Sequence, residues 1–95
     1  PLDRMAADLL QLRVGPTSRL HGVEVRELRL PVGASLSLVV RGDDILVPEG
    51  RTVLRHGDDL LVVAPRRSRE ATELRLRQIS AGGRLARWLP GPDQP

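Results

Sequence analysis

The sequence predicts a small α+β domain, built on one mostly antiparallel sheet with elements in the order β-α-β-β-β-α. Three observations lead to this prediction. Residues 35–41 alternate in polarity as a half-buried strand does, and turn residues 42–44 lead into a second apolar run at 45–47. An apolar run at 60–63 lies between turn residues, which is typical of a buried strand. A helical pattern follows from 69 to 81, and a chain of 95 residues leaves room for one such domain.

The first two elements are a strand and a short helical turn. In residues 8–14, three apolar side chains alternate with polar ones, and Gly15-Pro16 ends the strand. Thr17 and Ser18 can cap the turn that follows. The apolar side of that turn consists of Leu20, Val23 and Leu28.

The remaining strands are expected to form a hairpin and its neighbours. Within residues 35–41, the predicted core face consists of Leu36, Leu38 and Val40, with Val39 on the opposite face. A short strand is also possible at 52–54, and Pro65 closes the sheet. Val39 and Leu46 are therefore expected to leave an apolar patch that a partner would cover.

The C-terminal third is expected to be one helix and a tail. Ser68 is the predicted N-cap of a helix whose apolar positions include Ala71, Leu74 and Ile79. Gly82-Gly83 interrupts it, and a second short stripe follows at Leu85, Trp88 and Leu89. Because about two helical turns are too short to be stable alone, we expect residues 82–95, an arginine-rich tail, to be dispensable for folding.

Composition and charge exclude several classes of protein. All 15 basic residues are arginine; residues 1–65 carry 8 of them against 9 acidic residues, and residues 66–95 carry 7 against 3. A balanced body with a single aromatic residue is a poor platform for nucleic acid. The arginines of the tail are typical of a solvated helix face, more than of a contact with a membrane surface. No run approaches the roughly 18 apolar residues of a membrane span.

The sequence contains no recognisable catalytic or metal-binding motif, so an enzyme is not predicted. There is no cysteine, and His21 and His56 are not in metal-ligand spacing. No serine has the G-x-S-x-G context of a nucleophile. The acidic pairs Asp43-Asp44 and Asp58-Asp59 are best interpreted as turn and strand-entry residues. No metal or cofactor is expected.

An ordered set of residues resembles the TrkA-C domain, also called the RCK C-terminal domain. The resemblance covers residues 8–64, about sixty per cent of the chain. Its first half rests on Ser18, Gly22, Val23, Glu27, Leu28 and Pro31. Its second half rests on Arg41, Pro48, Thr52, Leu54, Gly57, Asp58, Leu60 and Val62. The family fold agrees with the element order above, and the resemblance implies a homodimer with the domain at residues 8–81.

The segment that follows this body resembles bacterial potassium/proton antiporters of the cation/proton antiporter family. It reads REATELRLRQISAGGRLARWL. In these proteins a membrane domain precedes a cytosolic TrkA-C module, so residues 1–7 would be the end of a linker. The resemblance implies a regulatory domain at the cytoplasmic face of the cell membrane, attached to an integral membrane antiporter.

The resemblance further implies that the domain senses a small ligand, with cyclic di-AMP at the dimer interface as the expected one. Such a ligand requires an apolar cleft for two adenines and cations for two phosphates. The expected wall is Leu38, Val39, Val40 and Ile45, and the expected phosphate ligands are Arg41, Arg51, Arg55 and His56. Arg41 is the preferred phosphate partner, because it ends the best strand and carries a fork of donors.

Two alternatives from other classes remain open at the level of sequence. The same domain can be a purely structural dimerisation module without a ligand. It can also be the effector domain of a winged-helix transcription regulator, although no DNA-binding helix is present in residues 1–95. Titration with cyclic di-AMP separates the first alternative from a sensor, and the sequence upstream of Pro1 separates the second from a transporter.

Overall fold

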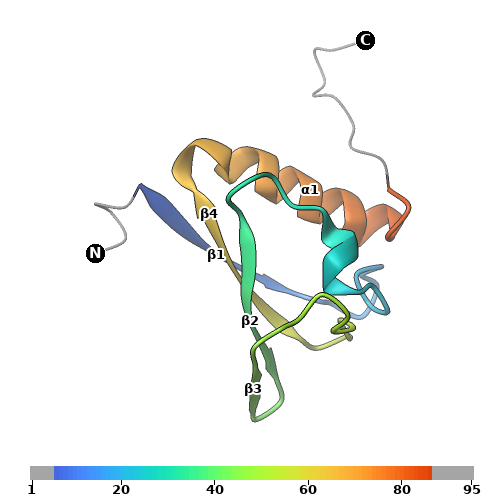
Figure 1. The fold of residues 1–95 in the computed structure, drawn as a ribbon. Helices are drawn as coiled ribbons and strands as arrows, with labels where there is room; N and C mark the ends of the chain where they lie inside the picture. The colour runs from blue at the N-terminus through green and yellow to red at the C-terminus, as the bar shows by residue number, and fades with distance from the viewer. Residues whose placement is uncertain (1–5, 87–95) are drawn as a thin grey trace.

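The computed structural model describes residues 6–86 of the chain. Within them, a four-stranded antiparallel sheet has the order β1-β4-β2-β3, and a single α-helix lies along it (Figure 1). The strands are β1 (Ala7–Arg13), β2 (Ser35–Arg41), β3 (Asp44–Leu46) and β4 (Asp59–Pro65). The helical elements are the 3-10 turns η1 (Val25–Leu28) and η2 (Arg66–Ser68) and the helix α1 (Arg69–Gly82). The predicted α+β class with an antiparallel sheet is confirmed.

Strand β4 occupies the middle of the sheet, between β1 and β2. Its apolar run alternates between two environments, with Leu60, Val62 and Ala64 buried and Leu61 and Val63 half-buried. The buried set faces α1 and the loops, whereas the half-buried set lies on the open face. One face of the sheet is therefore the floor of the core, as expected for an antiparallel sheet covered on one side.

A β-bulge in β2 reverses the alternation that the sequence predicts. Leu36 pairs with Val62, but the next partner of β4, Leu61, lies opposite Leu38, so one extra residue of β2 is accommodated between them. Val39 consequently lies in the core with no exposed surface. The prediction that Val39 faces away from the core is wrong. A strict period of two does not allow for the one residue by which β2 exceeds β4 at the bulge.

The core is formed by both sheet and loops. Its buried apolar members are Leu10, Val14, Leu20, Val23, Leu28, Leu36, Val39, Leu54, Leu60, Val62, Ala64, Leu76 and Ile79. Helix α1 contributes Leu76 and Ile79 together with two polar residues, Thr72 and Arg75. Thr72 donates its hydroxyl to the carbonyl of Ser68 at 2.7 Å, which satisfies it. Ile79 is buried as predicted, but Thr72 and Arg75 are buried in place of the predicted Ala71 and Leu74, since a buried face that includes polar residues cannot be found from apolarity alone.

Three smaller predictions about local structure also need correction. The turn before β2 is the 3-10 helix η1, which is capped by Glu24 and Glu27 in a reciprocal capping box and not by Ser18. Residues 52–54 do not form a strand; Val53 makes one isolated bridge with Glu24. The side chain of Ser68 makes no capping hydrogen bond, although α1 does begin at the next residue.

The start of the tail is attached to the body. Leu85 is 86% exposed, so it does not pack on the sheet, and Trp88 and Leu89 lie outside the described residues. The buried Arg75 side chain, however, donates from Nη1 to the carbonyl of Ala86 at 2.8 Å. Residues 83–86 therefore supply an acceptor to a buried cation, and the expectation that everything beyond Gly82 is dispensable needs revision.

We expect a chain that ends at Gly82 to be less stable than the full chain by about 1–3 kcal/mol, because Arg75 loses a hydrogen-bond acceptor. For a domain of this size, that loss corresponds to a drop in Tm of at least about 4 °C. A chain that ends after residue 87 keeps the acceptor and is the control; its Tm should equal that of the full chain. Equal melting temperatures for all three chains would contradict the role given to Ala86.

Candidate functional site

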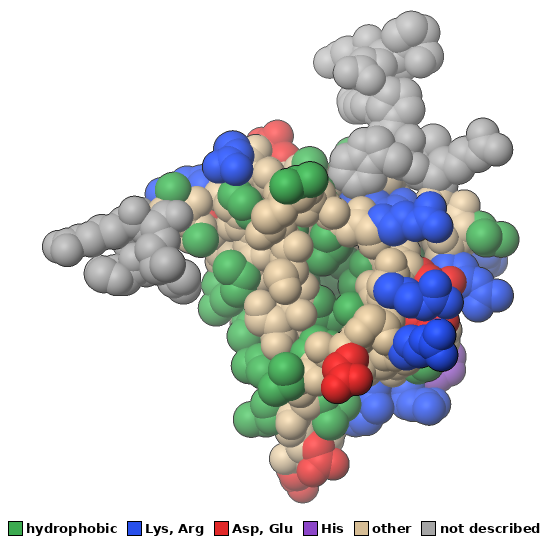
Figure 2. All heavy atoms as spheres, viewed as in Figure 1, with side chains coloured by type: hydrophobic (Ala, Val, Ile, Leu, Met, Phe, Trp, Pro, Cys, Tyr) green, Lys and Arg blue, Asp and Glu red, His purple; other side chains and the backbone are tan. Residues whose placement is uncertain are grey.

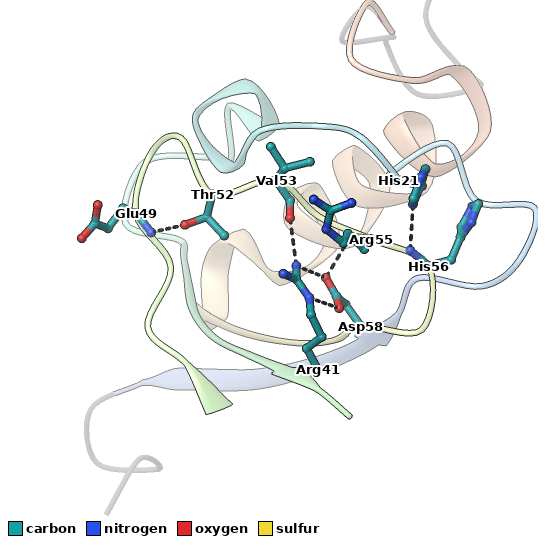
Figure 3. Close-up of polar contacts among 8 residues, drawn as sticks. All are labelled: His21, Arg41, Glu49, Thr52, Val53, Arg55, His56 and Asp58. Carbon is teal, nitrogen blue, oxygen red and sulfur yellow. Dashed lines mark hydrogen bonds and ion pairs between the residues drawn. The ribbon is translucent and has the colours of Figure 1, made fainter. Parts of the chain in front are cut away.

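An ion pair between Arg41 and Asp58 closes the loop that precedes β4 (Figure 3). The Arg41 guanidinium donates from Nε and Nη2 to the two oxygens of Asp58, both at 2.9 Å. Its Nη2 also donates to the carbonyl of Val53 at 2.9 Å, and the backbone N–H of Arg55 donates to the Asp58 carboxylate. The Asp58 side chain has no exposed surface, while 34% of the Arg41 side chain is exposed.

The charge of Asp58 is maintained by these donors. Burial by itself would raise the pKa of Asp58, but hydrogen bonds from Arg41 and from the Arg55 backbone outweigh burial and hold that pKa below its ordinary value. Asp58 does lie in the turn immediately before β4, as predicted, and its carboxylate in addition binds Arg41. Arg41, which we expected to bind phosphate, has its fork of donors committed to Asp58 and Val53, so the structure does not favour it as a phosphate ligand.

The other predicted site residues fall into two separate groups. Leu38 and Val40 lie on the open face of the sheet, where Val40 is paired with Ile45, itself 69% exposed. Arg51, Arg55 and His56 belong to the connection between β3 and β4, and Figure 3 shows Arg55 and His56 near Asp58. The predicted wall residues therefore lie in β2 and β3, whereas three of the four predicted phosphate ligands lie in the connection after β3. Val39 cannot line any cleft, because it is buried in the core.

A groove that the sequence did not reveal lies between η1, the start of β2 and the connection after β3. Its volume is about 360 Å³. Apolar side chains such as Leu30 and Leu36 line it together with the charged residues Arg26, Arg29 and Glu49, and more of its surface is polar than apolar. Figure 2 shows a hollow with hydrophobic walls on this face, and arginine side chains gather along one side of it. The groove thus combines an apolar wall with cations at its rim.

Arg29 is the distinctive residue of this groove. It has a φ of +46°, a left-handed conformation that few residues other than glycine adopt. It is exposed, and among residues 6–86 no hydrogen bond or ion pair to its side chain is found. This conformation makes Arg29 the C-cap that ends η1, and it leaves the guanidinium beside the groove.

A second arginine, Arg75, lies near Arg29, and the two positive charges repel each other. It is 4% exposed, and its Nε donates to the carbonyl of Leu28 at 2.8 Å, so it meets the chain immediately before Arg29. Burial lowers the pKa of Arg75, and the positive charge of Arg29 lowers that pKa further. No carboxylate is found bonded to either guanidinium within the described part of the chain. An anion beside Arg29 would relieve this repulsion.

The remaining charges around η1 do not neutralise this pair. The Arg26 guanidinium lies 3.1 Å from Glu24, which fixes the start of η1 and, with Arg51 and Arg84 nearby, lowers the pKa of Glu24. Hydrogen bonding by Arg26 is the largest of these effects. Arg29 therefore keeps no bonded carboxylate among the described residues, and Arg51 from the predicted set acts on Glu24.

Searches for two other kinds of site give no candidate in the residues that the structure describes. No group of three or more His, Asp or Glu side chains in 6–86 could hold a metal ion. No helix in that range is long and apolar enough to cross a membrane. The side chains of His21 and His56 do meet, with their rings stacked at 4.0 Å.

The fold and the groove define a class: a small antiparallel α+β domain with a groove that carries arginines at its rim. The model of the TrkA-C domain family matches residues 9–77, and the chain belongs to this family. That match lies within the expected domain at residues 8–81, whose bounds stay a prediction.

Similar proteins include potassium uptake proteins of bacteria and archaea. The chain is 38% identical over 58 residues to "Trk system potassium uptake protein TrkA" of Mycobacterium tuberculosis, covering 61% of this chain and 26% of that protein. It is 28% identical over 58 residues to "Trk system potassium uptake protein TrkA homolog 2" of Methanosarcina mazei, covering 61% and 13%. The chain therefore spans about a quarter or less of the length of these relatives.

Solved structures share the fold. A chain of "GsuK channel bound to NAD" superposes with a TM-score of 0.63 and 20% identity, over 77% of this chain and 14% of that chain. "Structure of RCK domain with cda" superposes with a TM-score of 0.54 and 23% identity, over 72% of this chain and 96% of that chain. At these identities the likeness establishes an RCK-type fold.

Arg41→Ala is expected to lower the free energy of unfolding by about 2–4 kcal/mol, because it leaves the buried carboxylate of Asp58 without its counter-ion. The lower end of the range allows for the solvent that reaches Arg41. Since the pKa of Asp58 is lowered in the folded state, the contribution of the pair is complete above about pH 4 and is lost as the pH falls further. The difference in unfolding free energy between the original chain and Arg41→Ala should therefore shrink in acid.

Urea unfolding at pH 7 and at pH 3 measures the difference in unfolding free energy between the original chain and Arg41→Ala. Arg55→Ala is the matched control, because Arg55 contributes its backbone N–H to Asp58 and that group survives the substitution. An Arg41→Ala protein as stable as the Arg55→Ala protein would show that the ion pair contributes nothing.

Proposed function

We propose that this chain is a ligand-sensing regulatory domain of a potassium transporter, namely the cytosolic TrkA-C domain of a potassium/proton antiporter. Membership of the TrkA-C family and the similarity to Trk system potassium uptake proteins support a role in potassium transport. The observation that carries the sensing role is Arg29, a cation with no bonded carboxylate among residues 6–86, held in a left-handed conformation at a groove of mixed polar and apolar lining. The attachment to an antiporter rests on the resemblance of residues 69–89 alone.

The proposed ligand is cyclic di-AMP. The groove offers apolar surface for an adenine, and Arg29 offers the planar fork of donors that suits a phosphate. The RCK domain that was solved with cda has the same fold over nearly its whole length, which supports the view that such a domain can take a small ligand. Arg29 replaces Arg41 as the proposed phosphate ligand, because Arg41 is committed to Asp58.

The symmetry of this ligand favours a homodimer. Cyclic di-AMP carries two adenines and two phosphates, whereas the groove of one chain presents a single unpaired arginine, Arg29. Two copies whose grooves face each other would provide one arginine for each phosphate. The ligand would then lie at the dimer interface, as the resemblance implies, and binding would change how the two copies are held together.

A structural dimerisation module without a ligand is the second candidate. The observation that favours it is the open face of the sheet, where Ile45 is 69% and Leu9 is 48% exposed. Leu38 and Val63 extend this apolar surface across β2 and β4. Apolar faces of this kind are frequently covered by a partner. This candidate predicts a dimer that does not respond to cyclic di-AMP.

Calorimetric titration with cyclic di-AMP tests the sensing role. Arg29→Gly should weaken binding by about 10- to 150-fold, because one charge-assisted contact is lost. Its melting temperature should stay equal to that of the original chain or rise, since glycine accepts the positive φ and the repulsion of Arg75 is removed. Arg67→Ala, which removes the same charge outside the groove, should bind as the original chain does.

The outcomes separate the ligand from the residue. No heat with the original chain at high micromolar concentration would reject cyclic di-AMP and leave the dimerisation module. Binding that is equal in the original and Arg29→Gly chains would retain the ligand and reject the groove.

Light scattering tests the dimer. We expect a mass of about twice the 10.5 kDa of one chain, because a domain of this size buries a small core and exposes an apolar sheet face. Ile45→Glu should shift the protein towards monomer at little cost in stability, since Ile45 is largely exposed. A dimer that survives Ile45→Glu places the contact on another surface, and a monomer at high micromolar concentration contradicts the dimer itself.

A further inference from the structure

The two histidines of the chain meet although they are 35 positions apart in sequence. Their rings are stacked with centroids 4.0 Å apart and planes inclined by 16°. The backbone N–H of His56 donates to Nδ1 of His21 at 2.9 Å, as Figure 3 shows. The Nε2 atom of His56 lies 3.3 Å from the carbonyl of Ser18. Two loops of the domain are thus joined through one pair of imidazoles.

This geometry assigns donor and acceptor roles to the two rings. Because Nδ1 of His21 accepts from a backbone N–H, that nitrogen carries no proton while the bond is made. A carbonyl only accepts, so Nε2 of His56 carries a proton and donates to Ser18. His56 can gain a second proton at Nδ1 and keep this bond. His21 cannot be protonated at Nδ1 without losing the hydrogen bond from the His56 backbone N–H.

Arginines belong to the same part of the domain as the histidine pair. Arg19 and Arg55 are sequence neighbours of the two loops, and Arg77 of α1 lines the same surface as Ser18. The nearest carboxylate in the loop of His56 is Asp58, which is already paired with Arg41. No acidic group among residues 6–86 is found bonded to either imidazole, so a positive charge on His21 would lie against a stacked ring without a counter-ion bonded to it.

The contact lies where it can act on the rest of the fold. The segment of His21 is bonded to α1, because the Arg19 N–H donates to the carbonyl of Ser80 at 2.8 Å. The loop of His56 carries Asp58, which holds Arg41 at the end of β2. A change at the histidine pair therefore loosens the connection between α1 and the loop that fixes β2.

We propose that His21 and His56 form a proton-sensitive latch, closed while His21 is neutral and opened when Nδ1 of His21 is protonated. Imidazole changes charge between pH 5 and 8, so the latch responds within the range that a cell can reach. The inference is independent of cyclic di-AMP and of the groove. It assigns to this domain a sensitivity to acid that its carboxylates do not supply, because carboxylates titrate at lower pH.

Urea unfolding of the full chain at pH 7.5 and pH 5.5 tests the latch. Acid should raise the unfolding equilibrium constant of the original chain by about 2- to 12-fold, the equivalent of one hydrogen bond. His21→Asn removes the titrating group and should abolish this response. His56→Asn keeps both His21 and the backbone donor of residue 56, so it is the matched control and should retain the response.

The NMR resonance of the His56 backbone amide is a second readout that does not depend on stability. It should move as His21 is titrated in the original chain and should not move over the same range in His21→Asn. A full acid response in His21→Asn, or the loss of the response in His56→Asn, would overturn the assignment of Nδ1 of His21 as the switch. A His56 amide resonance that ignores pH in the original chain would overturn it as well.

Discussion

The buried carboxylate of Asp58 holds the domain together at the point where three parts of the chain meet. Its side chain accepts from Arg41 at the end of β2 and from the backbone of its own loop. Its backbone carbonyl accepts from Val14, the residue after β1, at 2.8 Å. A buried charge is tolerated only when such donors surround it, so the ends of β1 and β2 and the start of β4 are fixed relative to one another.

This constraint also decides which arginines are available for other purposes. Arg41 is held by Asp58, and Arg26 is held by Glu24, whereas Arg29 and Arg75 lie together without a carboxylate among the described residues. The carboxylates of Asp58 and Glu24 therefore position loops, and the guanidinium of Arg29 at the groove has no carboxylate bonded to it among the described residues. A protein selected for stability alone would place a neutral residue or a glycine at position 29.

The parts of the fold that depend on local pattern could be predicted from the sequence, whereas those that depend on long-range contacts could not. The bounds of β2 and the start of α1 follow from polarity and turn residues. The burial of Val39 could not be predicted, because the bulge arises from pairing with β4. Arg41 and Asp58 were both present in the family pattern, and their occurrence together in it was the one signal that could have suggested an ion pair. Nothing comparable in the sequence distinguishes Arg29 from its exposed neighbours.

The order of the strands has a consequence for how the chain acquires its structure during synthesis. Strand β4 is the last to be translated, yet it is the one that both β1 and β2 pair with. Until it leaves the ribosome, β1 has no partner, and the β2–β3 hairpin stands alone, which is marginal in water. The sheet must therefore form nearly in one step, late, and through contacts between distant residues, a topology that slows folding. A nascent chain interrupted before residue 59 would expose its apolar strands to chaperones or to other chains.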